Sequence, residues 1–258
     1  MINEINNLLT FNNQEVYYYL SLETFVNHVI KNEHLEILFS HTDYLEDEQE
    51  FQQGIDDLNN IPGIDRALTM NLGSFKNLYP FQLSLSTAKD CYPMWKIYGK
   101  GDPGIMLIFN FEKLKEVFTH IHPCLYTNTE NYNKVRQFLH DSITSNDLGV
   151  TNHIDHDRIL TLFPYLAKNN AYKYEKEVRI IHEIRDCDNT IFIQRNNILK
   201  QYKKVIFPSE TLSQIMIGPC REEEFAKTAQ SLLVLCAKHK FKHFTNRKIV
   251  RSSIPVRF

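Results

Sequence analysis

Two glutamates and an arginine alternate along one short stretch of the sequence, AYKYEKEVRIIHEI at residues 171–184. Side chains on a β-strand point to its two faces in turn, so Glu175, Glu177 and Arg179 would share one face if this stretch is a strand. Two neighbouring carboxylates with a cation beside them suit chemistry in which a sugar carbon becomes positively charged. The same three charges would also fit a strand face exposed to solvent, and their spacing leaves both interpretations open.

A second candidate is the stretch YPMWKIYGKGDPGIML at residues 92–107, which contains the only tryptophan, Trp95, beside a glycine-rich turn. Aromatic rings next to glycines can stack on a planar ligand that approaches the backbone closely. Trp95 could instead anchor the core, and we predict that it is mostly buried while Tyr98 lies nearer to a ligand. In SLST at residues 84–87, Ser84 and Ser86 share a strand face and can orient a carboxylate or bond a ligand amide.

Histidine and cysteine spacing gives little support for a metal site. His153 and His156 are three residues apart, but no second pair with ligand spacing accompanies them, so we expect no metal. The five cysteines include no CxxC pair, which is typical of reduced thiols in the cytoplasm. No apolar run has membrane-spanning length and the N-terminus lacks a signal-peptide pattern, so we predict a cytoplasmic protein without a membrane partner.

Charge is distributed unevenly along a chain whose formal net charge is only −2. Residues 33–66 contain ten acidic residues against one basic residue, whereas residues 238–258 contain seven basic residues and no acidic one. The basic end also contains Phe241 and Phe244, and basic residues interleaved with aromatic ones suit contact with a nucleic acid. A basic surface strand without a ligand explains the same pattern.

Strands are the main elements expected to hold these residues. Ser21 predicts the N-cap of a helix over residues 21–33, and a second amphipathic helix is expected over residues 221–239. Residues 112–170 are mostly helical in pattern, and the 258 residues suit a single α+β domain. Apolar runs bounded by turns predict strands at 16–20, 35–40, 81–88, 103–111, 177–184, 190–194, 203–207, 214–218 and 252–258.

Taken in order over residues 16–218, these segments resemble a widespread bacterial family of unknown function. Its members contain blocks written YKYRS, FNDP, MWxxYG and YEkEyR. The corresponding stretches here are YYYLS at 17–21, LEDE at 45–48, MWKIYG at 94–99 and YEKEVR at 174–179. The chain differs from the family at Leu20, where arginine is usual, and in LEDE, which keeps Asp47 but has Glu46 in place of asparagine.

That family is in turn similar to ADP-ribosyltransferases, which have an aromatic or basic residue on the first strand, a Ser/Thr strand and a late ExE pair. The resemblance implies a split, strand-rich α+β fold that binds NAD, as a substrate, in a cleft between two sheets. It also implies that Glu177 is the catalytic carboxylate, that Glu175 orients the acceptor and that Ser86 positions Glu177. The residues expected to contact NAD or border its site are Tyr19, Tyr98, Arg179 and Asp47. Arg179 would pair with a carboxylate or hold the pyrophosphate, and the acidic segment 43–50 is expected to border the same cleft as Glu177.

The function expected from this resemblance is NAD-dependent ADP-ribosyl transfer or NAD hydrolysis, in a bacterial toxin or a phage-defence effector. The acceptor would be a protein or a nucleic acid. Two alternatives from other classes stay open. One is a binding or interaction module without activity on the same fold, and the other is a nuclease in which Asp47, Glu175 and Glu177 hold Mg²⁺.

Overall fold

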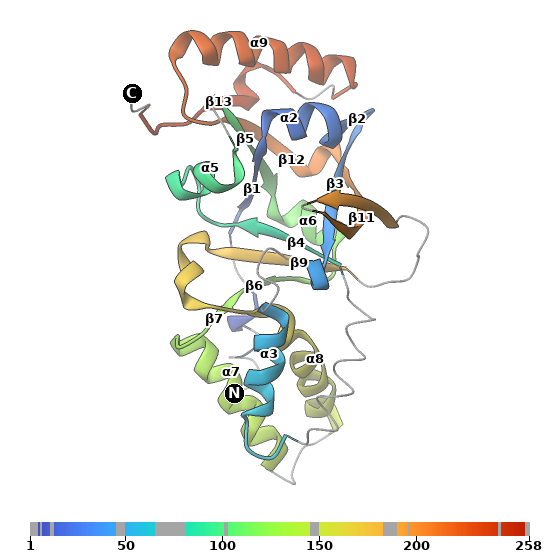
Figure 1. Ribbon diagram of the computed structural model, residues 1–258, viewed down its shortest axis with the longest axis vertical. Coiled ribbons are helices and arrows are strands. Elements are labelled where there is room, and N and C mark those ends of the chain that lie inside the picture. The colour runs from blue at the N-terminus through green and yellow to red at the C-terminus, as the bar shows by residue number, and fades with distance from the viewer. Residues whose placement is uncertain are drawn as a thin grey trace. The chain divides into compact units, whose positions relative to one another are not determined.

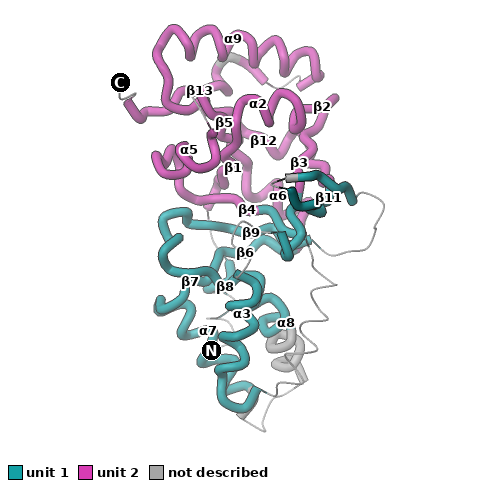
Figure 2. Tube along the Cα trace, viewed as in Figure 1, with its two compact units in different colours: residues 1–12, 39–83, 120–203 teal, residues 13–38, 84–119, 204–258 magenta. Residues whose placement is uncertain are grey.

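The helices and strands of the computed structural model belong to two compact units, each made of three stretches of chain (Figure 2). Unit 1 comprises residues 1–12, 39–83 and 120–203, and unit 2 comprises residues 13–38, 84–119 and 204–258. Both units contain strands and helices, so the predicted α+β class is confirmed, while the ADP-ribosyltransferase-like arrangement stays a prediction. The structure describes Ile5 and residues 7–10, 13–44, 50–64, 81–100, 103–144, 150–182, 190–195, 197–241 and 244–255.

Unit 2 is built on a mixed sheet with β5 at its centre (Figure 1). β5 runs antiparallel to β1 and to β12, and β13 joins β12 in parallel. The first six residues of β5 are buried, as expected for a strand that is covered on both faces. The strands are β1 (Glu15–Ser21), β4 (Phe81–Ser86), β5 (Gly104–Asn110), β12 (Leu212–Ile217) and β13 (Ile249–Arg251).

Two sequence predictions for unit 2 are wrong in part, one for the helix after Ser21 and one for the closing strand. Ser21 is the predicted N-cap, since its Oγ accepts a hydrogen bond from the Thr24 N–H at 3.1 Å. The helix is much shorter than predicted, because the chain enters a π-helical turn and then strand β2, which pairs with β3. The closing strand is β13, which precedes the predicted range. The elements are α2 (Leu22–Thr24), η1 (Phe25–Val29), β2 (Ile30–Lys31), β3 (His34–His41), α5 (Tyr92–Tyr98), α6 (Phe111–Val117), η5 (Ser209–Thr211), α9 (Glu222–Lys238) and η6 (Asn246–Lys248).

Unit 1 combines three longer helices with short strands (Figure 1). The helices are α3 (Glu50–Asn59), α7 (Glu130–Thr144) and α8 (Val150–Leu166), and α3 packs against α8 and β8. β6 pairs antiparallel with β9, which places His122 opposite Arg179. The other elements are η2 (Thr42–Tyr44), β6 (Ile121–Pro123), β7 (Leu125–Tyr126), β8 (Ala167–Lys168), η3 (Asn170–Glu175), β9 (Glu177–His182), β10 (Thr190–Arg195) and β11 (Ile198–Pro208), the last of which continues into unit 2.

The hydrophobic core of unit 1 shows which face of β9 is covered. Ile181 of β9 is buried in one cluster with Phe51 of α3 and Phe163 of α8. Because strand side chains alternate, Glu177 and Arg179 are on the same face of β9 as Ile181. The charged face of this strand is therefore turned towards the helices.

Candidate functional site

The strand that carries Glu177 begins at the predicted residue, so Glu175 lies before the strand. Glu175 is the last residue of the 3₁₀ turn η3, and β9 starts at Glu177. Lys176 between them has a left-handed backbone with φ of 45° and ψ of 50°, which breaks the strand alternation. The prediction that Glu175 shares a strand face with Glu177 and Arg179 is therefore wrong, although its carboxylate still reaches the same site.

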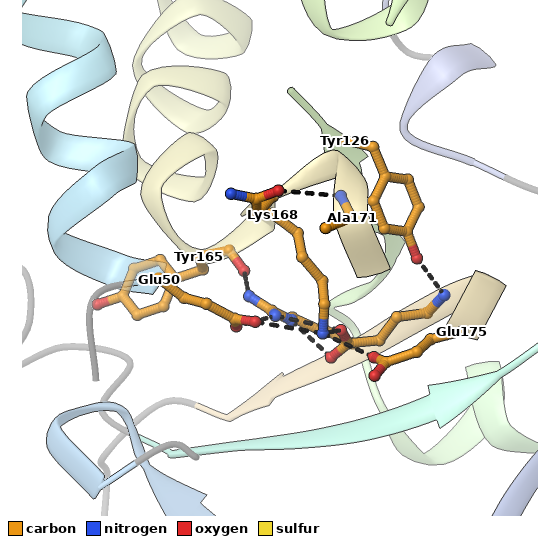
Figure 3. A network of polar contacts seen from close by, with 9 residues as sticks. Glu50, Tyr126, Tyr165, Lys168, Ala171 and Glu175 are labelled. Carbon is orange, nitrogen blue, oxygen red and sulfur yellow. Dashed lines mark hydrogen bonds and ion pairs between the residues drawn. The ribbon is translucent and has the colours of Figure 1, made fainter. Parts of the chain in front are cut away.

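The two predicted glutamates meet at a lysine that the sequence analysis did not identify (Figure 3). Lys168, from β8, donates from Nζ to Glu175 Oε2 at 2.8 Å and more closely to Glu177 Oε2. The same ammonium lies 3.2 Å from Oε1 of Glu50, the first residue of α3. In Figure 3 the side chains of Glu50, Lys168 and Glu175 point towards one another.

Arg179 completes this network from β9. Its Nε donates to Glu177 Oε1 at 2.8 Å, and its Nη2 donates to Glu177 Oε2 at 3.2 Å and also to Glu50. Its Nη1 donates to the backbone carbonyl of Tyr165 at 2.6 Å. The prediction that Arg179 pairs with a carboxylate is confirmed. We refer to the five side chains of Glu50, Lys168, Glu175, Glu177 and Arg179 as the ionic network.

The ionic network is buried inside unit 1. Side-chain exposure is 2% for Glu177 and Arg179, and 7% for Glu50, Lys168 and Glu175. The charged face of β9 is therefore covered by protein, and the alternative of a solvent-exposed strand face is wrong. Charges this deeply buried are stable only when they are paired and hydrogen-bonded.

The ionic network contains more carboxylates than cations. Three carboxylates and two cations give a formal charge of −3 + 2 = −1. Burial by itself raises the pKa of the Glu177 carboxyl, but Arg179 and Lys168 outweigh burial and hold that pKa below its usual range. Burial lowers the pKa of the Lys168 ammonium, and the charges of Glu177 and Glu50 more than reverse this effect and raise it. Glu177 and Lys168 are therefore both charged at neutral pH.

Backbone contacts fix the start of β9. The Glu177 N–H donates to the hydroxyl of Tyr126 at 2.8 Å, and the Glu177 carbonyl accepts from the Cys124 N–H at 3.0 Å. Burial raises the pKa of the Cys124 thiol well above its usual value, so this side chain adds no charge to the site. The Glu177 carboxylate is thus held by its backbone as well as by its ionic partners.

Lys168 and Tyr126 were missed by the sequence analysis, and Glu50 was not singled out within its acidic segment. The residues of that segment look alike in the sequence, and Lys168 lies in LAKNN without any periodic pattern. Glu50 and Tyr126 are brought to the site by contacts between segments far apart in the chain. The burial of Glu50 at the start of α3 was the one property that would have marked it, and burial is not visible in the sequence.

The predicted NAD-contacting residues Tyr19, Ser86 and Tyr98 belong to unit 2, whereas the ionic network belongs to unit 1. The Tyr19 hydroxyl donates to the Ala88 carbonyl at 2.6 Å and accepts from the Cys91 N–H at 3.1 Å. Ser86 Oγ accepts from the Ala88 N–H at 2.9 Å. Both side chains thus hold the turn after β4, while Tyr98 is half-buried at the end of α5. Asp47 and the rest of residues 45–49 lie outside the described residues. Glu50, at the end of the segment 43–50, pairs with Lys168 and Arg179, the two cations that bond Glu177.

Trp95 is buried, with 5% of its surface exposed, which confirms that prediction. Its ring meets Tyr19 edge-on, with 4.9 Å between ring centroids and an angle of 81°. A Cβ at Gly104 or Gly218 would approach the Trp95 ring to 3.3 Å or 3.0 Å, so these glycines provide the space for the ring. Trp95 therefore anchors the packing of unit 2.

The basic C-terminal segment does not present its aromatic rings to solvent. Phe241 is 2% exposed and Phe244 is 9% exposed. Neither ring can stack on a base, so this part of the nucleic-acid prediction is wrong, while contact through the basic side chains stays a prediction.

Within the described ranges, no group of three or more His, Cys, Asp or Glu side chains is arranged to hold a metal ion. No helix among the described residues has the length and apolar character needed to cross a membrane.

Comparison with known proteins gives a family match for part of the chain. No curated protein and no solved structure matches the sequence significantly. The blocks MWKIYG and YEKEVR, which carry the resemblance to a family of unknown function, both lie within one matched segment. Residues 94–180 match the protein family of unknown function DUF2971.

Proposed function

We propose that this protein cleaves the bond between nicotinamide and ribose in NAD, as an ADP-ribosyltransferase or an NAD glycohydrolase. Glu177 would stabilise the positive charge that develops at the ribose carbon, and Glu175 would orient the acceptor and take its proton. The bond from ribose C1′ to the nicotinamide nitrogen breaks, both electrons leave with nicotinamide, and the acceptor nucleophile forms the new bond at C1′. A role as a toxin or a phage-defence effector is proposed on the family resemblance alone.

The observation that carries this proposal is the formal charge of −1 carried by the five side chains of the ionic network. A buried site with a net negative formal charge favours a positively charged guest. The nicotinamide ring of NAD is a cation, and the ribosyl group becomes cationic as the bond breaks. An anionic carboxylate stabilises this second charge more strongly than the ground state, and it therefore accelerates the reaction.

The decisive measurement is nicotinamide release and ADP-ribose transfer by purified protein supplied with NAD, RNA and cell lysate. Glu177→Gln keeps the side-chain volume and removes the charge, so release should fall by about 10²–10³-fold, a larger change than the loss of NAD affinity. Glu175→Gln should impair transfer more than hydrolysis. Glu130→Gln is the matched control, since this exposed glutamate of α7 pairs only with Lys134 among the described residues.

One observation favours the alternative of a binding module without activity. Both carboxylate oxygens of Glu177 already accept hydrogen bonds from Arg179 and Lys168. A carboxylate with both oxygens occupied must lose a partner before it can contact a substrate. If the wild-type protein binds NAD without releasing nicotinamide, the binding module is correct and the enzyme proposal fails.

A further inference from the structure

Three buried polar atoms without partners lie at the end of the β3–β4 pair that belongs to unit 1, which includes residues 39–83. They are Nε2 and Oε1 of Gln82 and Oγ1 of Thr42, and none forms a hydrogen bond among the described residues. Gln82 and Thr42 are each 2% exposed. Gln82 lies opposite Ser40 in the strand register, and Ser40 is two positions before Thr42. These atoms therefore belong to the same end of the sheet.

An unbonded buried amide is unusual. More than about 90% of buried polar groups have a hydrogen-bond partner, because leaving one without a partner destabilises the folded chain. We therefore expect Gln82 to find its partner in something that the free chain does not supply.

The face of the sheet on which Gln82 lies follows from the strand register. Phe81 pairs with His41, and Phe39 is two residues before His41, so these three side chains share one face. His182 of β9 meets Phe39 edge-on, with 5.9 Å between ring centroids, and therefore lies on that face as well. By alternation, Gln82 on β4 and Arg179 on β9 both lie on the opposite face. This is the face that carries the ionic network.

A side-chain amide offers one acceptor and a donor group in a plane, and its natural complement is another primary carboxamide. Two parallel hydrogen bonds would join the two amides, and the Thr42 hydroxyl would supply a third. A cationic ring that carries a carboxamide would satisfy both the amide and the formal charge of −1 on the same face.

We propose that Gln82, assisted by Thr42, hydrogen-bonds the carboxamide of a ligand bound on this face and so determines its specificity. For the identity of the ligand this inference rests on the proposed function, which makes the carboxamide that of nicotinamide.

The first test compares the thermal melting of the wild-type protein with that of Gln82→Met, which keeps the side-chain shape and removes the amide. Because the amide is unbonded in the free protein, Gln82→Met should melt about 2–4 °C higher than the wild type. Nicotinamide should raise the melting temperature of the wild type and leave that of Gln82→Met unchanged. Gln137→Met is the control, since exposed Gln137 of α7 donates to Asp141 at 2.7 Å, and it should keep the nicotinamide response.

The second test compares nicotinamide with 3-acetylpyridine, which is uncharged like nicotinamide but lacks the amide donor. The wild type should bind nicotinamide about 10–100-fold more tightly, because 3-acetylpyridine leaves the Gln82 carbonyl without a donor. Gln82→Met should lose this preference.

Several outcomes would overturn the inference. If Gln82→Met melts lower than the wild type, the amide is already bonded in the free protein, for example to an ordered water. If the variant keeps the preference for nicotinamide, or if nicotinamide does not affect the wild type, Gln82 does not determine specificity.

The two proposals can fail separately. Gln82-dependent nicotinamide binding without release of nicotinamide from NAD would refute the enzyme proposal and support this inference. NAD turnover with the same KM in Gln82→Met would refute this inference and leave the enzyme proposal intact.

Discussion

Glu177 in unit 1 and Asp90 in unit 2 are both held as anions, but by different kinds of partner. Glu177 is bonded to two cations, whereas Asp90 accepts hydrogen bonds only from neutral donors among the described residues. Asp90 Oδ1 accepts from Trp95 Nε1 at 2.9 Å and Ser252 Oγ at 2.6 Å. Its Oδ2 accepts from the backbone N–H and the Oγ of Ser253 at 2.7 and 2.8 Å.

The difference follows from burial. Asp90 is partly exposed, so water hydrates its carboxylate, and hydrogen bonds from neutral donors are enough to keep it ionised. Glu177 is buried, and full charges are needed to offset the loss of hydration. Removing a partner should therefore cost far more in the ionic network than at Asp90, where the carboxylate mainly ties the C-terminal segment to the turn before α5.

Arg179→Met should give the largest loss of stability. It leaves Glu177 and Glu50 with Lys168 as their one remaining cation in the ionic network, and breaking a buried pair costs about 3–5 kcal/mol. Guanidinium unfolding at pH 7 measures this loss, and Lys134→Met on the exposed pair with Glu130 is the control. Equal free energies of unfolding for the two variants would show that the ionic network contributes no more than a surface pair.

Trp95→Ala should cost slightly less, about 3–4 kcal/mol, because it creates a cavity but leaves no buried charge unpaired. The ring is buried against Gly104 and Gly218, whose backbone has little freedom to fill the space. The shift in melting temperature measures this effect. A variant that melts like the wild type but no longer binds NAD would reverse our assignment and make Trp95 a stacking residue.

Asp90→Asn should have a smaller effect, about 1–2 kcal/mol. Asparagine tolerates the left-handed backbone at this position, where φ is 50°, so the change tests the carboxylate and not the turn. One amide oxygen can still accept from Trp95 and Ser252, while the amide nitrogen would face the donors of Ser253. A loss as large as that of Arg179→Met would contradict the contrast drawn above.

The pH dependence of stability separates the same two sites. At Asp90, burial alone would raise the carboxyl pKa, but hydrogen bonds from Ser252, Trp95 and Ser253 leave it below its usual value. The pKa of Glu177 is also depressed, so both carboxylates contribute stability that is present above their unfolded pKa values of about 4 and is lost on further acidification. Glu177→Gln should flatten the fall in unfolding free energy between about pH 5 and pH 2 more than Asp90→Asn does. Urea unfolding over this range measures both slopes, and identical slopes in the two variants would refute the difference.

Local sequence pattern predicted the elements whose signal is carried by neighbouring residues. Alternation placed Glu177 and Arg179 on one face of β9, an unbroken apolar run predicted β5, and helical periodicity predicted α9. These predictions held because strand and helix periods act over a few residues. The helix after Ser21 ended early because pairing with β3, a contact outside the helix, competed with its local signal.

The composition of the site was decided by the tertiary structure. The sequence determined that two glutamates and an arginine lie close together, and that a lone tryptophan precedes a glycine turn. It did not determine that α3 covers the charged face with Glu50, that Lys168 joins three carboxylates, or that a left-handed Lys176 moves Glu175 out of the strand. The physical reason is that period-two alternation assigns a side chain to a face, whereas burial of that face depends on packing between segments more than a hundred residues apart, as between Glu50 and Arg179.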